Sequence, residues 1–163
     1  MPMNRSRDEQ FHEVARGLGH SFEGEIRIGG NYVSLMENDG EIWISGQIPR
    51  VGDKVVVTGR AGTDVSLDQA RTAARICVMR ALALLRQSLG SLERIRKVLR
   101  ITVYVQSAQD FTQQSEVADG ASEVLYAILG QAGVHTRTSV GVYQLPKNAA
   151  VELDMVVAVD PAL

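Results

Sequence analysis

The last part of the sequence places an arginine and a glutamate where they could act together on a small anionic molecule. Arg137 opens a strand-like run, and Glu152 lies in a second run that follows a Leu-Pro-Lys-Asn turn. A guanidinium binds a carboxylate through two parallel hydrogen bonds. A carboxylate beside a bound substrate can hold a water molecule or accept its proton. The pair would therefore suit a small carboxylate-bearing substrate that is attacked by water.

Each of these residues also has a simpler interpretation, as a solvent-exposed residue of a strand that binds nothing. The other candidate groups are weaker still. Cys77 lies on an alanine-rich helix face, where a cysteine usually serves as a small buried hydrophobe. The segment Gly59-Arg-Ala-Gly62 lacks the lysine and the helix start of a phosphate loop. The three histidines show no metal-ligand spacing, so we expect no metal site.

The overall composition narrows the class of protein. The chain has 163 residues, of which 45% are hydrophobic and 22% charged, and this predicts one domain over residues 1–163. The net charge is −2, which is unlike the basic footprint of a nucleic-acid binder. One cysteine allows no intrachain disulfide. No signal-like start and no run of ~20 apolar residues is present, so we expect a cytoplasmic location.

Local patterns predict the first elements that must position the candidate residues. Apolar spacing predicts a short helix over residues 7–18, and two strand-like runs flank a turn at Asn38-Asp39-Gly40. A further strand is predicted over residues 54–59. The longest helix begins at the capping box of Ser66 with Gln69 and ends at Gly90. We expect its arginines to form the solvated face; they are Arg71, Arg75, Arg80 and Arg86.

The second half of the chain completes the predicted domain. A strand is predicted over residues 98–107, a second core helix over 112–129, and a terminal β-hairpin over 137–159. The order predicts a two-layer α+β domain with a mixed sheet of five to six strands and two main helices on one face, plus the short N-terminal helix. The strands are too apolar for the other face to be solvated, so we expect self-association through it.

Several blocks of the sequence resemble the RidA/YjgF family of enamine/imine deaminases, once described as endoribonucleases. They occur in the family's order over about residues 29–159. The blocks are GGNYV (29–33), ISGQIP (44–49), TVYVQSAQDF (102–111) and RTSVGVYQLPKNAAVELDMVVAV (137–159). The resemblance implies a chorismate-mutase-like fold for residues 26–163, with residues 1–25 as an N-terminal extension. It also implies a homotrimer with three sites at the subunit clefts.

The resemblance assigns a role to individual residues. Arg137 would anchor the substrate carboxylate, and Glu152 would position the hydrolytic water. Tyr32 and Ser45 would line the site. Ser139 stands where many members have a cysteine, and Ser115 stands where they commonly have an asparagine.

The activity implied by the resemblance is hydrolysis of enamines or imines, such as 2-aminoacrylate, to 2-keto acids and ammonia, with no cofactor. Two alternatives stay open, a non-catalytic trimer that binds a small ligand and an endoribonuclease. In a terminal hairpin, Arg137 would lie opposite residue 156 or 157, about 13–16 Å from Glu152 at ~3.3 Å per residue. We therefore expect the two residues to serve one site from different chains.

Overall fold

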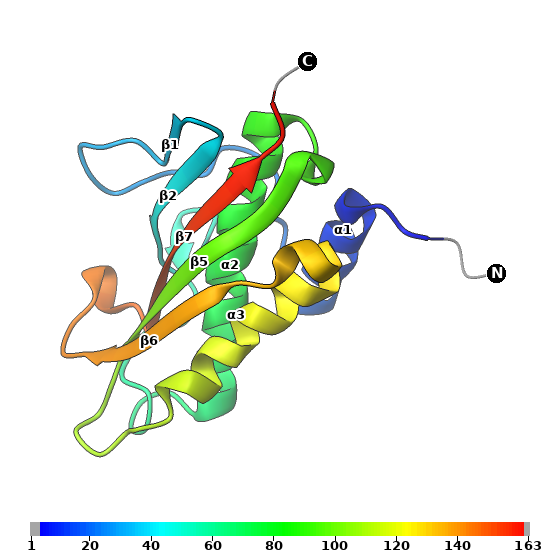
Figure 1. Ribbon diagram of the computed structural model, residues 1–163. Coiled ribbons are helices and arrows are strands. Elements are labelled where there is room, and N and C mark those ends of the chain that lie inside the picture. The colour runs from blue at the N-terminus through cyan, green and yellow to red at the C-terminus, as the bar shows by residue number, and fades with distance from the viewer. Residues whose placement is uncertain (1–3, 162–163) are drawn as a thin grey trace.

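Helix α2 (Leu67–Leu89) is the longest element of the computed structural model, which describes residues 4–161, and it crosses one face of the sheet (Figure 1). The Ser66 side chain accepts a hydrogen bond from the Gln69 backbone, and the Gln69 side chain accepts one from the Ser66 backbone. Gly90 ends the helix with a φ of 84°, which favours glycine. The predicted start and end of this helix are therefore confirmed.

The first hairpin is also confirmed. Strand β1 (Leu35–Asn38) pairs antiparallel with β2 (Glu41–Gln47). Asp39 and Gly40 form the two-residue turn with φ values of 50° and 80°. Both values lie in the left-handed region that Asp and Gly tolerate and that tight hairpins need.

The predicted terminal hairpin is wrong, because its two strands are not neighbours. Strand β6 (Thr136–Val142) pairs parallel with β5 (Ile95–Gln106), whereas β7 (Val151–Val159) lies between β2 and β5 and is antiparallel to both. The chain passes from β5 to β6 through α3 (Gln114–Leu129), and such a helical crossover joins parallel strands. Strand β7 carries the more apolar run and takes the central position.

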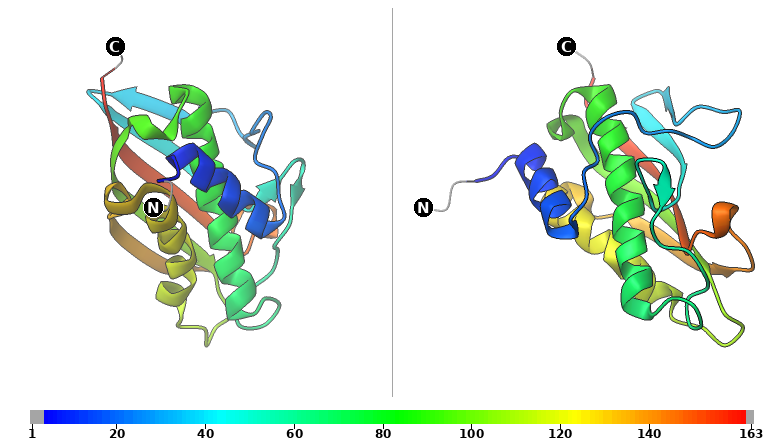
Figure 2. Two further views of the ribbon diagram at one scale, coloured as in Figure 1. Left: turned by 90° about the vertical axis from the view of Figure 1, so that its right-hand side faces the viewer. Right: turned by 180° about the vertical axis from the view of Figure 1, so that it is seen from behind.

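The complete sheet has the strand order β1-β2-β7-β5-β6. Helices α2 and α3 cover one face of it, and α1 (Arg7–Leu18) packs against these two helices (Figure 2). This arrangement confirms the two-layer α+β domain with an added N-terminal helix. Two further strands, β3 (Arg50–Val51) and β4 (Lys54–Val55), form a separate small sheet. The strand predicted over residues 54–59 is thus limited to its first two residues.

No α-helix of residues 4–161 lies over the second face of the sheet (Figure 1). The register aligns Met36 with Trp43 and Trp43 with Val156, and the first two side chains are more than half exposed. Polar side chains share this face, including Glu152 and Asp154 on β7. Its coverage by other copies of the chain stays a prediction. None of the helices within residues 4–161 combines the length and apolarity needed to cross a membrane.

Candidate functional site

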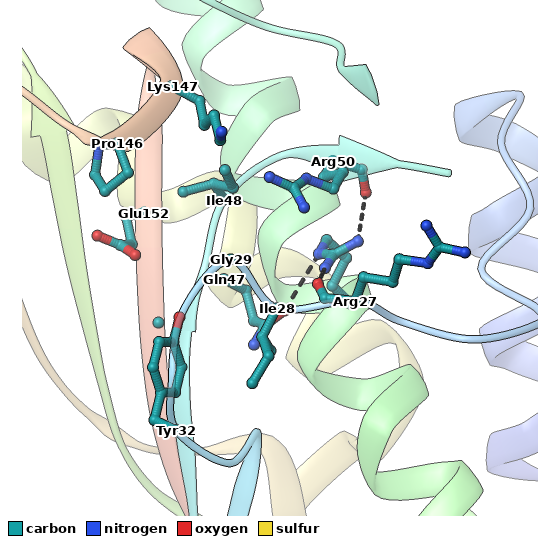
Figure 3. A pocket seen from close by; sticks show the side chains of 12 residues that line it. Arg27, Ile28, Gly29, Tyr32, Gln47, Ile48, Arg50, Pro146, Lys147 and Glu152 are labelled. Atoms are coloured by element: carbon teal, nitrogen blue, oxygen red, sulfur yellow. Dashed lines mark hydrogen bonds between the residues drawn. The ribbon is translucent and has the colours of Figure 1, made fainter. Parts of the chain in front are cut away.

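A pocket of about 220 Å³ opens at the end of β2, next to β7 (Figure 3). The loop of residues 27–32, the turn at 146–147 and Arg80 of α2 complete its wall, so residues far apart in sequence meet there. Glu152 is the one acidic residue among those that line the pocket in the described part of the chain. The lining residues are Arg27, Ile28, Gly29, Tyr32, Gly46, Gln47, Ile48, Arg50, Arg80, Pro146, Lys147 and Glu152.

Glu152 reaches the pocket because of its place on β7. Its neighbours Val151 and Leu153 are fully buried under the helices, so the alternation of the strand turns Glu152 to the open face. The side chain is half-buried. Burial raises the pKa of the Glu152 carboxyl above its ordinary value, and the nearby Asp154 carboxylate raises this pKa further.

An irregularity in β2 makes room for this carboxylate. The pairing of β2 with β7 shifts between Ile44 and Gln47, which leaves one extra residue on β2, as in a β-bulge. Gly46 lies in this bulge. A Cβ atom on Gly46 would lie 2.6 Å from Oε2 of Glu152, so the carboxylate packs where only a glycine leaves space.

Ser45 and Tyr32 belong to the same neighbourhood. The Ser45 hydroxyl donates a hydrogen bond of 2.7 Å to the Val33 carbonyl, and the Ser45 backbone N–H donates to the Ser34 carbonyl. These bonds fix the loop that carries Tyr32, a half-exposed residue that lines the pocket. Of the residues predicted for the site, Tyr32 and Glu152 thus line the pocket, whereas Ser45 does not line it and only bonds to the neighbouring loop.

Arg137 lies elsewhere in the same chain, on the helix-covered face of the sheet. Its Nη1 donates to Asp119 Oδ1 at 2.8 Å and to Ser122 Oγ at 3.0 Å. Its Nη2 donates to the carbonyl and the hydroxyl of Ser115 at 3.2 and 2.8 Å. These partners all come from α3. Arg137 and Ser115 are therefore brought together, but away from the pocket.

The separation of Arg137 from Glu152 follows from the sheet register. Arg137 aligns with Ile101 of β5, and Glu152 aligns with Tyr104 on the opposite face. The two residues are three positions apart along the strands, about 10 Å, and two strand spacings apart across the sheet, about another 10 Å. This replaces the hairpin geometry expected from the sequence. Ser139 aligns with Val103, on the face of Arg137, and does not line the pocket.

Arg80 of α2 lines the pocket, although it was expected to face solvent. Its expected position on a solvated helix face is wrong, because it is only 5% exposed. Its guanidinium donates to three oxygens, Gln47 Oε1 at 3.2 Å, the Arg50 carbonyl at 2.8 Å and the Arg27 carbonyl at 3.1 Å. The sequence does indicate burial of Arg80, because the residue is three positions after Cys77 and four before Leu84, on the apolar face of the helix. Burial lowers the pKa of Arg80.

Two further cations of the pocket were also missed. Arg50 lines it, and the Arg50 Nε is buried without a hydrogen-bond partner. Lys147 lies in the turn before β7 with a φ of 61°, a left-handed conformation that a non-glycine residue adopts only rarely. A basic residue in a turn or in a short strand is too common in sequences for either position to have been identified. No group of three His, Cys, Asp or Glu side chains within residues 4–161 could hold a metal ion.

Cys77 is inert, as expected. It is fully buried on α2, and burial raises the pKa of its thiol far above the ordinary value. The residue contributes to the core and not to the site.

Comparison with known proteins gives a consistent family of relatives. Residues 13–158 match the family model described as "YjgF/chorismate mutase-like, putative endoribonuclease". Protein TCP17 of Trypanosoma cruzi is 38% identical over 128 residues, which cover 78% of this chain and 80% of that protein.

Solved structures show the same fold. The protein Atu1372 of Agrobacterium tumefaciens, described as of unknown function, is 34% identical, with a TM-score of 0.84 over 94% of this chain and 95% of that one. E. coli TdcF with bound serine is 21% identical, with a TM-score of 0.60 over 82% of this chain and 91% of that one. The YjgF gene product of E. coli is 19% identical, with a TM-score of 0.59 over 85% and 95% of the two chains.

Proposed function

Because the chain belongs to the YjgF/chorismate mutase-like family, we propose that it hydrolyses reactive enamines or imines, such as 2-aminoacrylate, to 2-keto acids and ammonia. The observation that carries the proposal is the Glu152 carboxylate, half-buried and the one acidic residue among the described lining residues of a pocket of about 220 Å³. Such a pocket has room for a molecule of a few heavy atoms and a water. TdcF, which shares the fold, has been solved with a small amino acid, serine, bound.

In the proposed reaction an enamine first takes a proton on carbon and loses one from nitrogen, which makes it an imine. Glu152 holds a water molecule and accepts a proton from it as the oxygen bonds to the imine carbon. The imine nitrogen takes a proton from solvent, which gives a carbinolamine. Glu152 then returns its proton to this nitrogen as ammonia leaves, and the hydroxyl group loses its proton to solvent and becomes the carbonyl of the keto acid. The imine carbon is already electrophilic, so correct placement of water and substrate supplies most of the acceleration and no cofactor is required.

We also propose that Arg137 of a neighbouring protomer anchors the substrate carboxylate. Within one chain Arg137 and Glu152 lie on opposite faces of the sheet, so one chain cannot bring both to one ligand. Rotational symmetry in a trimer can place the Arg137 of one chain beside the Glu152 of the next. Asp119, Ser122 and Ser115 hold both terminal nitrogens of Arg137, so the substrate carboxylate would bind the guanidinium edge that includes Nε.

A second candidate function is binding without turnover. It is favoured by the cations around the pocket, which suit an anionic ligand whether or not water attacks it. An endoribonuclease is supported less well, because the net charge is −2 and no basic, aromatic-rich stripe is evident in the sequence.

The test is keto-acid release from 2-aminoacrylate generated enzymatically in the presence of the purified protein. We expect the wild-type protein to accelerate release and Glu152→Gln to lose at least about tenfold of this rate, in the range of a lost general base. Glu37→Gln, an exposed change on β1, is the matched control and should keep the rate. Equal acceleration by the wild type and Glu152→Gln would refute the role of Glu152. No acceleration by the wild type would refute the hydrolysis and favour the second candidate.

A further inference from the structure

The charges around the pocket are not balanced within the chain. Arg80 is buried, yet its guanidinium donates only to uncharged oxygens. Buried charges in proteins are normally paired, because an isolated charge loses its solvation. No acidic group within residues 4–161 forms an ion pair with Arg80, Arg50 or Lys147.

Arg50 has an unused donor at the same place. Its Nε is buried and donates to nothing in the described part of the chain, and such orphaned donors are rare in native proteins. Figure 3 shows the guanidinium of Arg50 on one side of Ile48 and the Glu152 carboxylate on the other, with Lys147 near the turn above them. A ligand in this pocket would therefore meet a cation and a carboxylate on different sides.

Arg27 provides an internal comparison. It also lines the pocket, but it forms ion pairs with Glu25 at 3.6 Å and Asp53 at 3.5 Å. In Figure 3 its side chain extends away from Arg50 and Lys147. Arg27 is thus already paired with acidic side chains, and within residues 4–161 Arg50, Arg80 and Lys147 are not.

We propose that Arg50, Arg80 and Lys147 form an anion-binding subsite. Arg50 binds an acidic group on the side chain of the ligand, and Arg80 and Lys147 add positive charge near it. The single carboxylate of Glu152 does not balance the cations of the pocket, and no acidic side chain pairs with Arg50 in the described part of the chain. The first carboxylate of the substrate is assigned to Arg137 of the neighbouring protomer, so the group that Arg50 binds is a second acid. The ligand class is therefore a small dicarboxylate. This inference rests on the proposed function. The substrates are then imines of 2-keto acids that carry an acidic side chain, and water converts their C=N bond to a carbonyl with release of ammonia.

The experiment measures binding of the keto-acid products by calorimetry at low ionic strength, so that it does not depend on turnover. We expect 2-oxoglutarate to bind the wild-type protein at least about tenfold more tightly than 2-oxobutanoate, which lacks the second acid. Arg50→Gln should lose this preference, roughly a ten- to hundredfold weakening for the dicarboxylate, as for a lost charge-assisted hydrogen bond. Arg16→Gln is the matched control, because Arg16 is an exposed arginine of α1 that pairs with Glu13 and does not line the pocket, and it should retain the preference.

Lys147→Gln gives a second measurement. The position is exposed, so the change leaves the core intact, and it should weaken the binding of 2-oxoglutarate by a few-fold. Equal affinity of the two keto acids for the wild type, or an unchanged preference in a folded Arg50→Gln, would overturn the subsite. Tighter binding of inorganic phosphate than of 2-oxoglutarate would overturn the carboxylate assignment.

The two proposals fail in distinguishable ways. If 2-oxoglutarate binds through Arg50 but 2-aminoacrylate is not hydrolysed, the subsite stands and the proposed reaction falls. If 2-aminoacrylate is hydrolysed while dicarboxylates bind no better than monocarboxylates, the reaction stands and the subsite falls.

Discussion

At the scale of single residues, the candidate site depends on one carboxylate and on the space left for it. Of the residues that the sequence predicted for the site, Glu152 and Tyr32 line one pocket, and Ser45 is bonded to the loop that carries Tyr32. Arg80 was expected to be exposed because it is charged, although its spacing places it on the apolar face of α2, where it is buried. Residue type is thus a poor guide to burial where a guanidinium can donate to three backbone and side-chain oxygens.

Gly46→Ala tests the space beside Glu152. The new methyl group would lie 2.6 Å from Oε2, and the carboxylate, at the end of a flexible side chain, would move instead of the backbone. We expect at least about tenfold slower keto-acid release, as for a misplaced general base, with little change in melting temperature. Gly17→Ala on α1, where a Cβ would meet nothing within 4 Å, is the control. An unchanged rate in Gly46→Ala would show that this packing does not matter.

The raised pKa of Glu152 predicts a pH-dependent effect on stability. The folded state binds the proton more tightly than the unfolded state, so this contribution to stability is full below the ordinary pKa of 4.5 and is lost as pH rises through the folded pKa. Glu152→Gln removes the cost of the desolvated charge. We therefore expect Glu152→Gln to melt at a higher temperature than wild type at pH 8 and at a similar temperature near pH 4. A lower melting temperature at pH 8 would contradict this.

At the scale of elements, helix ends and tight turns could be predicted from the sequence, whereas the pairing of strands could not. Helix α2 was predicted with its ends and the β1–β2 hairpin with its turn, because caps and a two-residue turn are local signals. The β6–β7 hairpin was wrong because two apolar runs joined by a turn do not reveal whether a third strand lies between them. The error changed the expected position of Arg137 relative to Glu152.

The contact between α2 and α3 gives a prediction at this scale. A Cβ atom on Gly120 would lie 2.5 Å from the Arg71 carbonyl, so the glycine permits the close approach of the two helices. We expect Gly120→Ala to lower the free energy of unfolding by about 1–3 kcal/mol, as for overpacking. Helix propensity alone would raise this free energy by about 1 kcal/mol. The sign of the change in chemical denaturation therefore decides between the two effects.

At the scale of the whole molecule, the open sheet face and the divided site point to the same assembly. Trp43 and Met36 are more than half exposed on that face, and Arg137 is remote from Glu152 within the chain. We expect light scattering at micromolar concentration to give about three times 17.7 kDa. Trp43→Glu should lower this mass by placing a charge in the interface. A stable wild-type monomer would contradict the proposed trimer.

The most direct test of the account is activity in mixed trimers, because its central claim is that Glu152 and a neighbour's Arg137 act on one substrate. Arg137→Ala and Glu152→Ala, each inactive alone, are denatured, mixed in equal amounts and refolded together. Random assembly leaves about a quarter of the clefts with both residues intact. We therefore predict that keto-acid release from 2-aminoacrylate returns to about a quarter of the wild-type rate. Mixed trimers as inactive as either variant alone would contradict the account.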